Sequence, residues 1–171
     1  MGFLAGKRIL ITGLLSNRSI AYGIAQACHR EGAELAFTYQ NDRFRARVAD
    51  MAAEFDSSLV FPCDVAEDGQ IEALFDAIRS AWGMLDGLVH AIAFAPREAI
   101  AGDFLEGASR DAFRVAHDIS SYSMVALARG AAPLMQGRAG AMLTLTYLGA
   151  VRTVPHYNTM GLAKASLEAA V

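Results

Sequence analysis

Three side chains near the C-terminal end of the sequence have the types and spacing needed for proton transfer. Tyr147 follows an apolar run that is typical of a buried strand, and Tyr157 and Lys164 stand seven residues apart on a predicted helix. Seven residues make almost two helical turns, so both side chains point the same way, about 10.5 Å apart along the axis. A phenol and an ammonium on one helix face predict a proton donor with an electrostatic helper.

The N-terminal segment predicts a site for an anion. The strand Arg8–Thr12 ends at Gly13, and Ser19 and Ile20 open the helix that follows. Free N–H groups at a helix N-terminus and the helix dipole attract phosphate. The loop lacks the full G-x-G-x-x-G fingerprint of dinucleotide-binding folds. Two interpretations therefore stay open for this segment, a dinucleotide site and an ordinary strand–helix turn.

Residues at the ends of the following strands could hold the rest of a dinucleotide. Gln40 follows the second strand, where such folds usually place an acid against the adenosine ribose, and a neutral side chain does not choose between NAD and NADP. Asp64 and Val65 follow the third strand, where an adenine could lie, although Asp64 could instead cap the helix near Asp68. The segment 92–95, from Ile92 to Ala95, ends the fourth strand at the same sheet edge, where open α/β sheets bind ligands.

Histidines and cysteines predict no metal centre. None of the four histidines stands at ligand spacing from another, and His90 in an apolar strand is typical of a core histidine. Cys28 and Cys63 form no ligand cluster, which favours reduced thiols of a cytosolic protein. We therefore expect the chemistry to depend on other side chains.

Short apolar runs alternate with amphipathic segments along the chain. The pattern predicts strands over 8–12, 34–39, 59–63, 87–92 and 141–146, and helices over 20–31, 44–55, 71–82, 109–134 and from 157 onward. On the first helix, the predicted buried stripe is Ile20, Ile24, Ala27 and Cys28. Repeated strand–helix–strand units predict an α/β fold, a doubly wound, parallel, Rossmann-like sheet in a single domain over 1–171. Pro62 cannot donate to a strand ladder, so we expect the third strand at an edge.

The C-terminal end of the sequence predicts a longer protein. The last helical pattern still runs at Val171, and the apolar fifth strand would be left as an exposed edge. We therefore expect a C-terminal part beyond these residues, and we do not expect the 171-residue chain alone to be active.

Composition restricts the partners. The chain is 54% hydrophobic and 19% charged, as expected of a globular protein, and its net charge of −3 gives no reason to expect nucleic acid or an anionic membrane as a partner. No apolar run reaches the ~18 residues that span a bilayer. The N-terminus leaves no room for a signal peptide, and Gly6 stands where myristoylation needs Ser or Thr. We expect a cytoplasmic protein.

Several segments together resemble one known family. They are AYGIAQA (21–27), HREGAELAFTYQND (29–42), CDVAED (63–68), HDISSYS (117–123), YLGA (147–150) and YNTMGLAKASLEA (157–169). The sequence is similar over its full length to the bacterial enoyl-acyl-carrier-protein reductases of fatty acid synthesis. These belong to the short-chain dehydrogenase/reductase superfamily. The Tyr-x6-Lys spacing of Tyr157 and Lys164 differs from the Tyr-x3-Lys of ordinary superfamily members.

The resemblance implies hydride transfer from NADH to a trans-2-enoyl thioester on acyl carrier protein, by a homotetramer with helices like 109–134 at its interface. It implies that Tyr157 hydrogen-bonds the enolate oxygen and that Lys164 holds the nicotinamide ribose. Tyr147 and Ala95 would line the substrate pocket. The implied cofactor-binding residues are Gly13, Ser19, Ile20, Gln40, Asp64, Val65, Ile92 and Lys164.

The chain departs from the family pattern at a few positions. Ala93 adds a methyl group where the family has glycine close to the expected nicotinamide, Val151 replaces a glutamate, and Thr146 replaces a serine. Two alternatives stay open, a carbonyl-reducing relative and a non-catalytic dinucleotide-binding paralogue. The Tyr-x6-Lys spacing argues against the first, and the presence of all three proton-transfer residues argues against the second.

Overall fold

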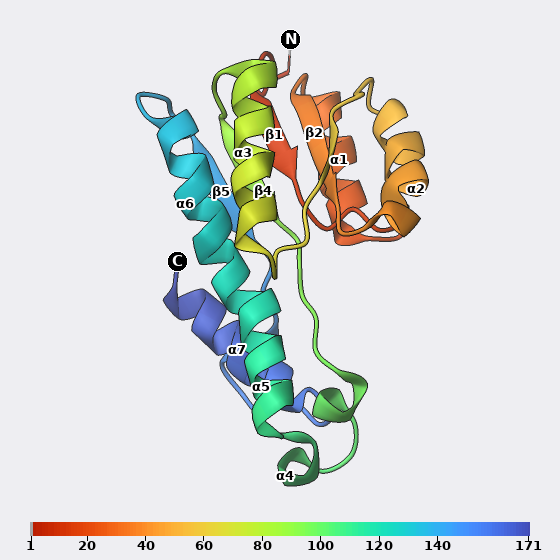
Figure 1. Cartoon of the computed structure of the whole chain (residues 1–171), viewed down its shortest axis with the longest axis vertical. Coiled ribbons are helices and arrows are strands. Elements are labelled where there is room, and N and C mark those ends of the chain that lie inside the picture. The colour runs from red at the N-terminus through yellow and green to blue at the C-terminus, as the bar shows by residue number, and fades with distance from the viewer. Residues whose placement is uncertain (1) are drawn as a thin grey trace. The chain divides into compact units, whose positions relative to one another are not determined.

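The computed structural model describes residues 2–171, and these divide into two compact units (Figure 1). The sheet unit comprises the chain up to Ala91 together with Leu127–Thr144. The helical unit comprises Ile92–Ala126 and Leu145–Val171. The single domain expected over 1–171 stays a prediction.

The sheet unit contains five parallel strands in the order β3-β2-β1-β4-β5. The strands are β1 (Arg8–Ile11), β2 (Glu34–Tyr39), β3 (Val60–Pro62), β4 (Gly87–His90) and β5 (Ala141–Thr144). The predicted doubly wound parallel sheet is confirmed, and so is the edge position of the strand that contains Pro62. Because all five strands run the same way, their carboxyl ends meet at one edge of the sheet.

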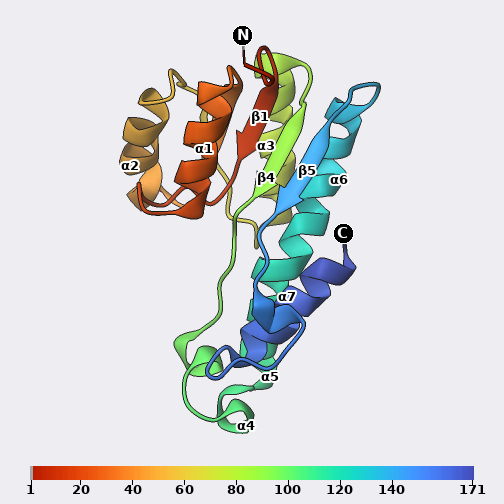
Figure 2. The ribbon, with the colours of Figure 1, turned by 180° about the vertical axis from the view of Figure 1, so that it is seen from behind.

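Helices cover both faces of this sheet. They are α1 (Ile20–Arg30), α2 (Asp42–Ala53), α3 (Asp68–Trp82) and, from Leu127 onward, α6 (Ser123–Met135). Figure 1 shows α3 in front of the strands, and Figure 2, from behind, shows α1 in front of them. Side chains alternate along a strand, so β1 directs Ile9 and Ile11 into the cluster beneath α1 and α2, and Leu10 to the opposite face. α3 is followed by Gly83, whose φ of +71° forms a left-handed cap.

The buried face of α1 differs in part from the predicted buried stripe. Ala21 and Ala25 are its buried residues, and Ile24 and Cys28 are only partly buried against the cluster. Ile20 is 67% exposed, so its place on the buried stripe was wrong. It is the first residue of α1, ahead of the turns that pack on the sheet, and the small alanines allow a close approach.

The helical unit consists of short elements around α7 (Asn158–Ala169). They are the 3-10 turn η1 (Arg97–Ile100), α4 (Phe104–Gly107), α5 (Arg110–His117), the π turn η2 (Asp118–Tyr122) and the 3-10 turn η3 (Leu148–Ala150), with the first turn of α6. Ala116, Met160 and Ala163 form the buried cluster of this unit, with Ala95 and Tyr157 packed against it. No helix within residues 2–171 is long and apolar enough to cross a membrane.

Four predicted boundaries in this part of the sequence were wrong. The helix expected over 109–134 is interrupted by η2, and Ser109 is the N-cap of its first part, α5. β4 ends at His90 and β5 at Thr144, each two residues early. The last helix does not run through Val171. It ends at Ala169, because Ala170 N donates to the Leu167 carbonyl at 3.1 Å, the tighter bond of a terminal 3-10 turn.

Candidate cofactor and substrate site

The turn after β1 is held tightly against the end of β4. Thr12 is fully buried, and its amide and hydroxyl both donate to the Val89 carbonyl at 2.9 Å. Gly13 has φ +80°, and a Cβ at this position would overlap the Ala91 carbonyl oxygen. Only glycine therefore fits here, both in backbone conformation and in space.

The N-terminus of α1 presents unused donors. Ser19 is the N-cap, and its hydroxyl donates to the Ser16 carbonyl at 2.7 Å and accepts from Tyr22 N at 3.3 Å. The amides of Ile20 and Ala21 donate to no other group in the described chain. Free amides at the positive end of a helix can bind a phosphate. This supports the anion-site interpretation over an ordinary turn.

Gln40 and Asp64 meet at the carboxyl ends of β2 and β3. The Gln40 Nε2 donates to Asp64 Oδ2 at 3.1 Å. A carboxylate can only accept, so the amide NH₂ of Gln40 must face Asp64, and its carbonyl oxygen faces away. The other oxygen of Asp64 accepts from Ala66 N at 3.1 Å, while Glu67 is the N-cap of α3. Asp64 therefore holds the turn before α3 without being its N-cap, and Val65 beside it is buried.

The two tyrosines contact each other in the helical unit. The rings of Tyr147 and Tyr157 lie 4.7 Å apart at 60°. Burial and, after it, the nearby Tyr147 raise the pKa of Tyr157 above its usual value of 10.0. At neutral pH the Tyr157 phenol is therefore protonated and can donate a hydrogen bond.

The backbone around Tyr157 is strained. His156 has φ +62° and Asn158 has φ +41°, a region that non-glycine residues rarely adopt. Gly149 has no Cβ, and one built there would overlap the Tyr157 ring. Strained residues of this kind cluster at functional sites, where the surrounding structure holds them in place.

Lys164 is an almost fully buried cation of α7. It is 5% exposed, and its Nζ donates to the Leu145 carbonyl at 2.6 Å. No carboxylate in the described chain lies within ion-pair distance of it. Burial lowers its pKa. One of its three N–H donors is used, so two are available for a hydroxyl-bearing ligand.

The predicted site residues thus fall into two sets. Gly13, Ser19, Ile20, Gln40, Asp64 and Val65 lie in the sheet unit, at the carboxyl ends of β1, β2 and β3. Ile92, Ala95, Tyr147, Tyr157 and Lys164 lie in the helical unit. Within that unit, Ala95 and Tyr157 pack on the same cluster of Ala116, Met160 and Ala163. His90 is a fully buried core residue whose Nδ1 is 2.8 Å from Thr144 Oγ1, as expected from its strand.

Sequence reasoning missed two serines of the π turn. Ser120 and Ser121 are buried, and their hydroxyls bond to the Phe94 main chain and to Ser166. The helical pattern runs through 109–134 without a Gly or Pro at the turn, so no periodicity marks it. The only sequence signal is a pair of serines at positions where a continuous helix would expect apolar residues.

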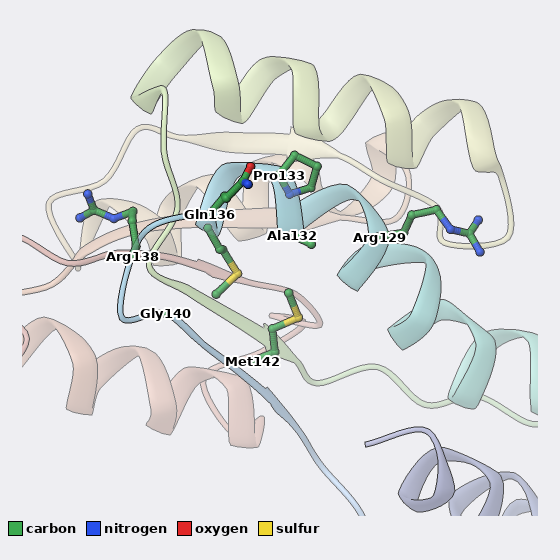
Figure 3. A pocket seen from close by; sticks show the side chains of 8 residues that line it. Arg129, Ala132, Pro133, Gln136, Arg138, Gly140 and Met142 are labelled. Carbon is green, nitrogen blue, oxygen red and sulfur yellow. The ribbon is translucent and has the colours of Figure 1, made fainter.

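A surface pocket of about 670 Å³ lies elsewhere in the sheet unit (Figure 3). Arg129 and Arg138 stand at its opposite ends, with Met142 between them. Gly140 precedes β5, so this pocket is at the amino ends of the strands. It does not belong to the set of residues at the carboxyl ends.

Comparison with known proteins agrees with this fold. Residues 13–171 match the family described as Enoyl-(Acyl carrier protein) reductase. The NADH enoyl-acyl-carrier-protein reductase FabI of Neisseria meningitidis serogroup B is 61% identical over all of this chain and 66% of its own length. The corresponding protein of Escherichia coli is 57% identical over 100% of this chain and 65% of its own.

Solved structures give the same result. The enoyl-acyl-carrier-protein reductase (NADH) of Aquifex aeolicus matches with a TM-score of 0.97 and 52% identity, over 99% of this chain and 67% of that one. The Bacillus cereus enoyl-acyl carrier protein reductase, solved with NADP+ and indole naphthyridinone, matches with a TM-score of 0.96 and 45% identity, over 100% and 66%.

The parallel sheet with free amides after β1 defines a Rossmann-like nucleotide-binding fold. Within that class, the chain belongs to the enoyl-(acyl carrier protein) reductase family. It spans about two thirds of the length of the curated relatives it matches, 66% and 65% of those two.

Proposed function

We propose that the protein is an NADH-dependent reductase of trans-2-enoyl thioesters carried on acyl carrier protein, acting in fatty acid elongation. The observation that carries the proposal is the presence of a protonated Tyr157 and a buried Lys164 in one unit of a chain of this family. The family match and the Tyr-x6-Lys spacing favour this reaction over carbonyl reduction.

The sheet unit fits the adenosine and phosphate part of the cofactor. The free amides of Ile20 and Ala21 would hold the pyrophosphate, and Gln40 and Asp64 would hold the adenosine. Val65 offers an apolar contact for the adenine. When bound, NADH supplies the hydride for the reaction. Ile92 and two free donors of Lys164 would hold the nicotinamide half.

Tyr157 would act on the thioester. Negative charge develops on the thioester oxygen as the double bond is reduced, and a donor aimed at that oxygen stabilises the transition state more than the ground state. The raised pKa of Tyr157 keeps its proton in place at neutral pH. Lys164 adds positive potential, while Tyr147 and Ala95 would contact the acyl chain.

Exposed apolar side chains on the helical unit support the proposed homotetramer. Phe113, Tyr122 and Val125 are 43%, 42% and 38% exposed, and they lie on α5, η2 and α6. These side chains lie on consecutive elements of the chain, and exposed apolar surface favours a protein interface. We propose that this surface joins subunits of a cytoplasmic assembly. Light scattering of the complete protein should report a tetramer. The double variant Tyr122→Glu, Val125→Glu should form smaller species.

The function is tested with two proteins, because the chain spans only two thirds of its relatives. One is the 171-residue chain, and the other is a chimera joining it to the part of the Neisseria meningitidis relative that the match leaves uncovered. We expect the chimera to oxidise NADH when given a crotonyl thioester. A folded chimera that binds NADH without reducing the thioester would overturn the proposal, and the chain alone is not expected to turn over.

Two variants of the chimera separate the proposed roles. Tyr157→Phe removes only the hydroxyl, so turnover should fall on the order of 10²-fold with NADH binding unchanged. Lys164→Ala should weaken NADH binding as well as turnover. Wild-type turnover in both variants would rule out the site.

A third variant tests the phosphate end. Ser19→Glu places a negative charge at the N-terminus of α1 and should weaken NADH binding, as measured by fluorescence. Ser16→Glu, on the loop before the helix, is a control for the added charge. Equal affinity in wild type and Ser19→Glu would contradict the assignment.

A further inference from the structure

The π turn η2 directs two neighbouring serine hydroxyls to different segments. Ser120 is fully buried and Ser121 is 5% exposed. The Ser121 hydroxyl is 2.9 Å from Ser166 Oγ on α7. The Ser120 hydroxyl accepts from Phe94 N at 2.9 Å and donates to the Phe94 carbonyl at 3.0 Å. A π turn inserted in a helix is often found at a functional site.

The two hydrogen bonds of Ser120 hold a segment that is not paired with any strand of the sheet. β4 ends at His90, and residues 91–96 have no regular structure before η1 begins at Arg97. One hydroxyl satisfies both main-chain groups of Phe94, which would otherwise lack partners. The Phe94 side chain is 53% exposed, so its own packing does not fix the segment.

This segment carries the proposed substrate contact. Ala95 follows Phe94 and packs against the cluster of Ala116, Met160 and Ala163, on which Tyr157 also packs. The position of Phe94 therefore determines where Ala95 lies relative to the Tyr157 phenol. A pocket wall that is no longer fixed contacts the bound substrate less well, and the loss of such binding raises the KM.

We propose that Ser120 is a positioning residue for the acyl substrate, acting through the Phe94 main chain. The inference rests on the proposed enoyl-thioester reduction. Without the Ser120 hydroxyl, the 91–96 segment loses its anchor, so Ala95 no longer forms a fixed wall beside Tyr157. The adenosine end of NADH binds residues of the sheet unit and is not affected.

The test compares kinetic constants in the chimera. Ser120→Ala, and the nearly isosteric Ser120→Cys, should raise the KM for the enoyl thioester about tenfold, as expected for the loss of one small apolar contact. The Kd for NADH should change less than this KM, because most of the proposed cofactor residues lie in the sheet unit and only Ile92 belongs to the 91–96 segment. Ser121→Ala is the matched control, because it removes a buried serine hydroxyl of the same turn and leaves the Phe94 bonds intact. Its KM should equal that of wild type.

Amide hydrogen exchange tests the same bonds without substrate. In the 171-residue chain, the Phe94 amide should exchange faster in Ser120→Ala than in wild type, and it should be unchanged in Ser121→Ala. A wild-type KM in Ser120→Cys would overturn the positioning role. If Ser120→Ala does not fold, Ser120→Cys alone tests that role. An inactive wild-type chimera would instead contradict the proposed function, and the positioning role with it.

Discussion

The sheet unit and the helical unit hold their candidate residues by different means. In the sheet unit, Gly13, Gln40 and Asp64 follow strands whose positions are fixed by continuous parallel ladders. In the helical unit, Tyr157 lies between two residues with positive φ, and Ala95 depends on a segment anchored by one serine. The first arrangement is repetitive, and the second depends on individual contacts.

This difference affects how each unit responds to a mutation. A strand end is held by main-chain bonds to one or two neighbouring strands, so the loss of one side-chain contact leaves its position largely unchanged. A segment without a ladder depends on few bonds, and the loss of one can free it. Segments with few buried contacts open at lower free energy than core strands do. Three predictions test this comparison.

The largest effect is expected at Gly13 of the sheet unit, where no side chain fits. Gly13→Ala should destabilise the protein by roughly 4 kcal/mol or more, since it combines a positive φ with overlap of the Ala91 carbonyl. Gly6→Ala is the matched control, because Gly6 has φ +71° and no atom within 4 Å of an added Cβ. It should cost only about 1 kcal/mol. Urea denaturation measures both, and equal losses would show that the close approach to Ala91 contributes nothing.

A buried carboxylate at the other end of the strands gives the next effect. The Asp86 side chain is 2% exposed and bonds to Arg138 Nη2 at 2.7 Å, Arg8 N at 3.0 Å and Lys7 Nζ at 3.2 Å. Burial alone would raise its pKa, but these hydrogen bonds outweigh it and lower the pKa from 3.8 to about 2. A lowered folded-state pKa stabilises the protein above the unfolded value, and this stability is lost as the pH falls through about 2.

We therefore expect Asp86→Asn to reduce stability at pH 7 by about 2 kcal/mol. The gap between wild type and variant should close between pH 4 and pH 2. Asp76→Asn is the control, because Asp76 pairs with Arg79 on α3 with its side chain 72% exposed. It should change stability little at any pH. If the difference in stability between wild type and Asp86→Asn were the same at pH 2 and pH 7, the charge of the carboxylate would not be what stabilises the folded protein.

The two units also differ in how far the sequence predicts them. Alternating and continuous apolar runs located all five strands, because burial in a sheet leaves a periodic pattern. β2 was predicted over its full extent, the end of the third helix at Trp82 was predicted correctly, and Pro62 correctly indicated an edge strand. For the candidate site, the sequence predicted Tyr157 and Lys164 on one helix face, but α7 begins at Asn158 and Tyr157 is only its N-cap. The residue types and the resemblance to a family indicated the other candidate residues.

The helical unit was predicted less well for physical reasons. The π turn at 118–122 and the positive φ values of His156 and Asn158 are set by tertiary contacts that leave no period in the sequence. The bond from Lys164 to the Leu145 carbonyl joins residues of two elements, so no local pattern indicates it. A strand-like run also continued past Thr144, where the chain in fact leaves the sheet.

The smallest effect compares the same substitution in both units. Thr12 and Thr159 are both fully buried. Thr12 Oγ1 donates to the Val89 carbonyl at 2.9 Å and accepts from Ala91 N at 3.4 Å. Thr159 Oγ1 has no hydrogen-bond partner among the described residues. Replacing threonine by valine keeps the shape and the β-branch and removes only the hydroxyl.

Opposite signs are expected for the two variants. Thr12→Val loses its bonds and should destabilise the protein by about 1 kcal/mol. Thr159→Val removes a buried polar group that gains nothing in the folded state, so it should stabilise by up to about 1 kcal/mol. Threonine and valine have similar helix propensity, so the position of Thr159 in a helix adds little to the difference between the two variants. Thermal and urea denaturation measure both effects. Loss of stability in Thr159→Val would mean that its hydroxyl has a partner, and the helical unit would then satisfy its buried polar groups as fully as the sheet does.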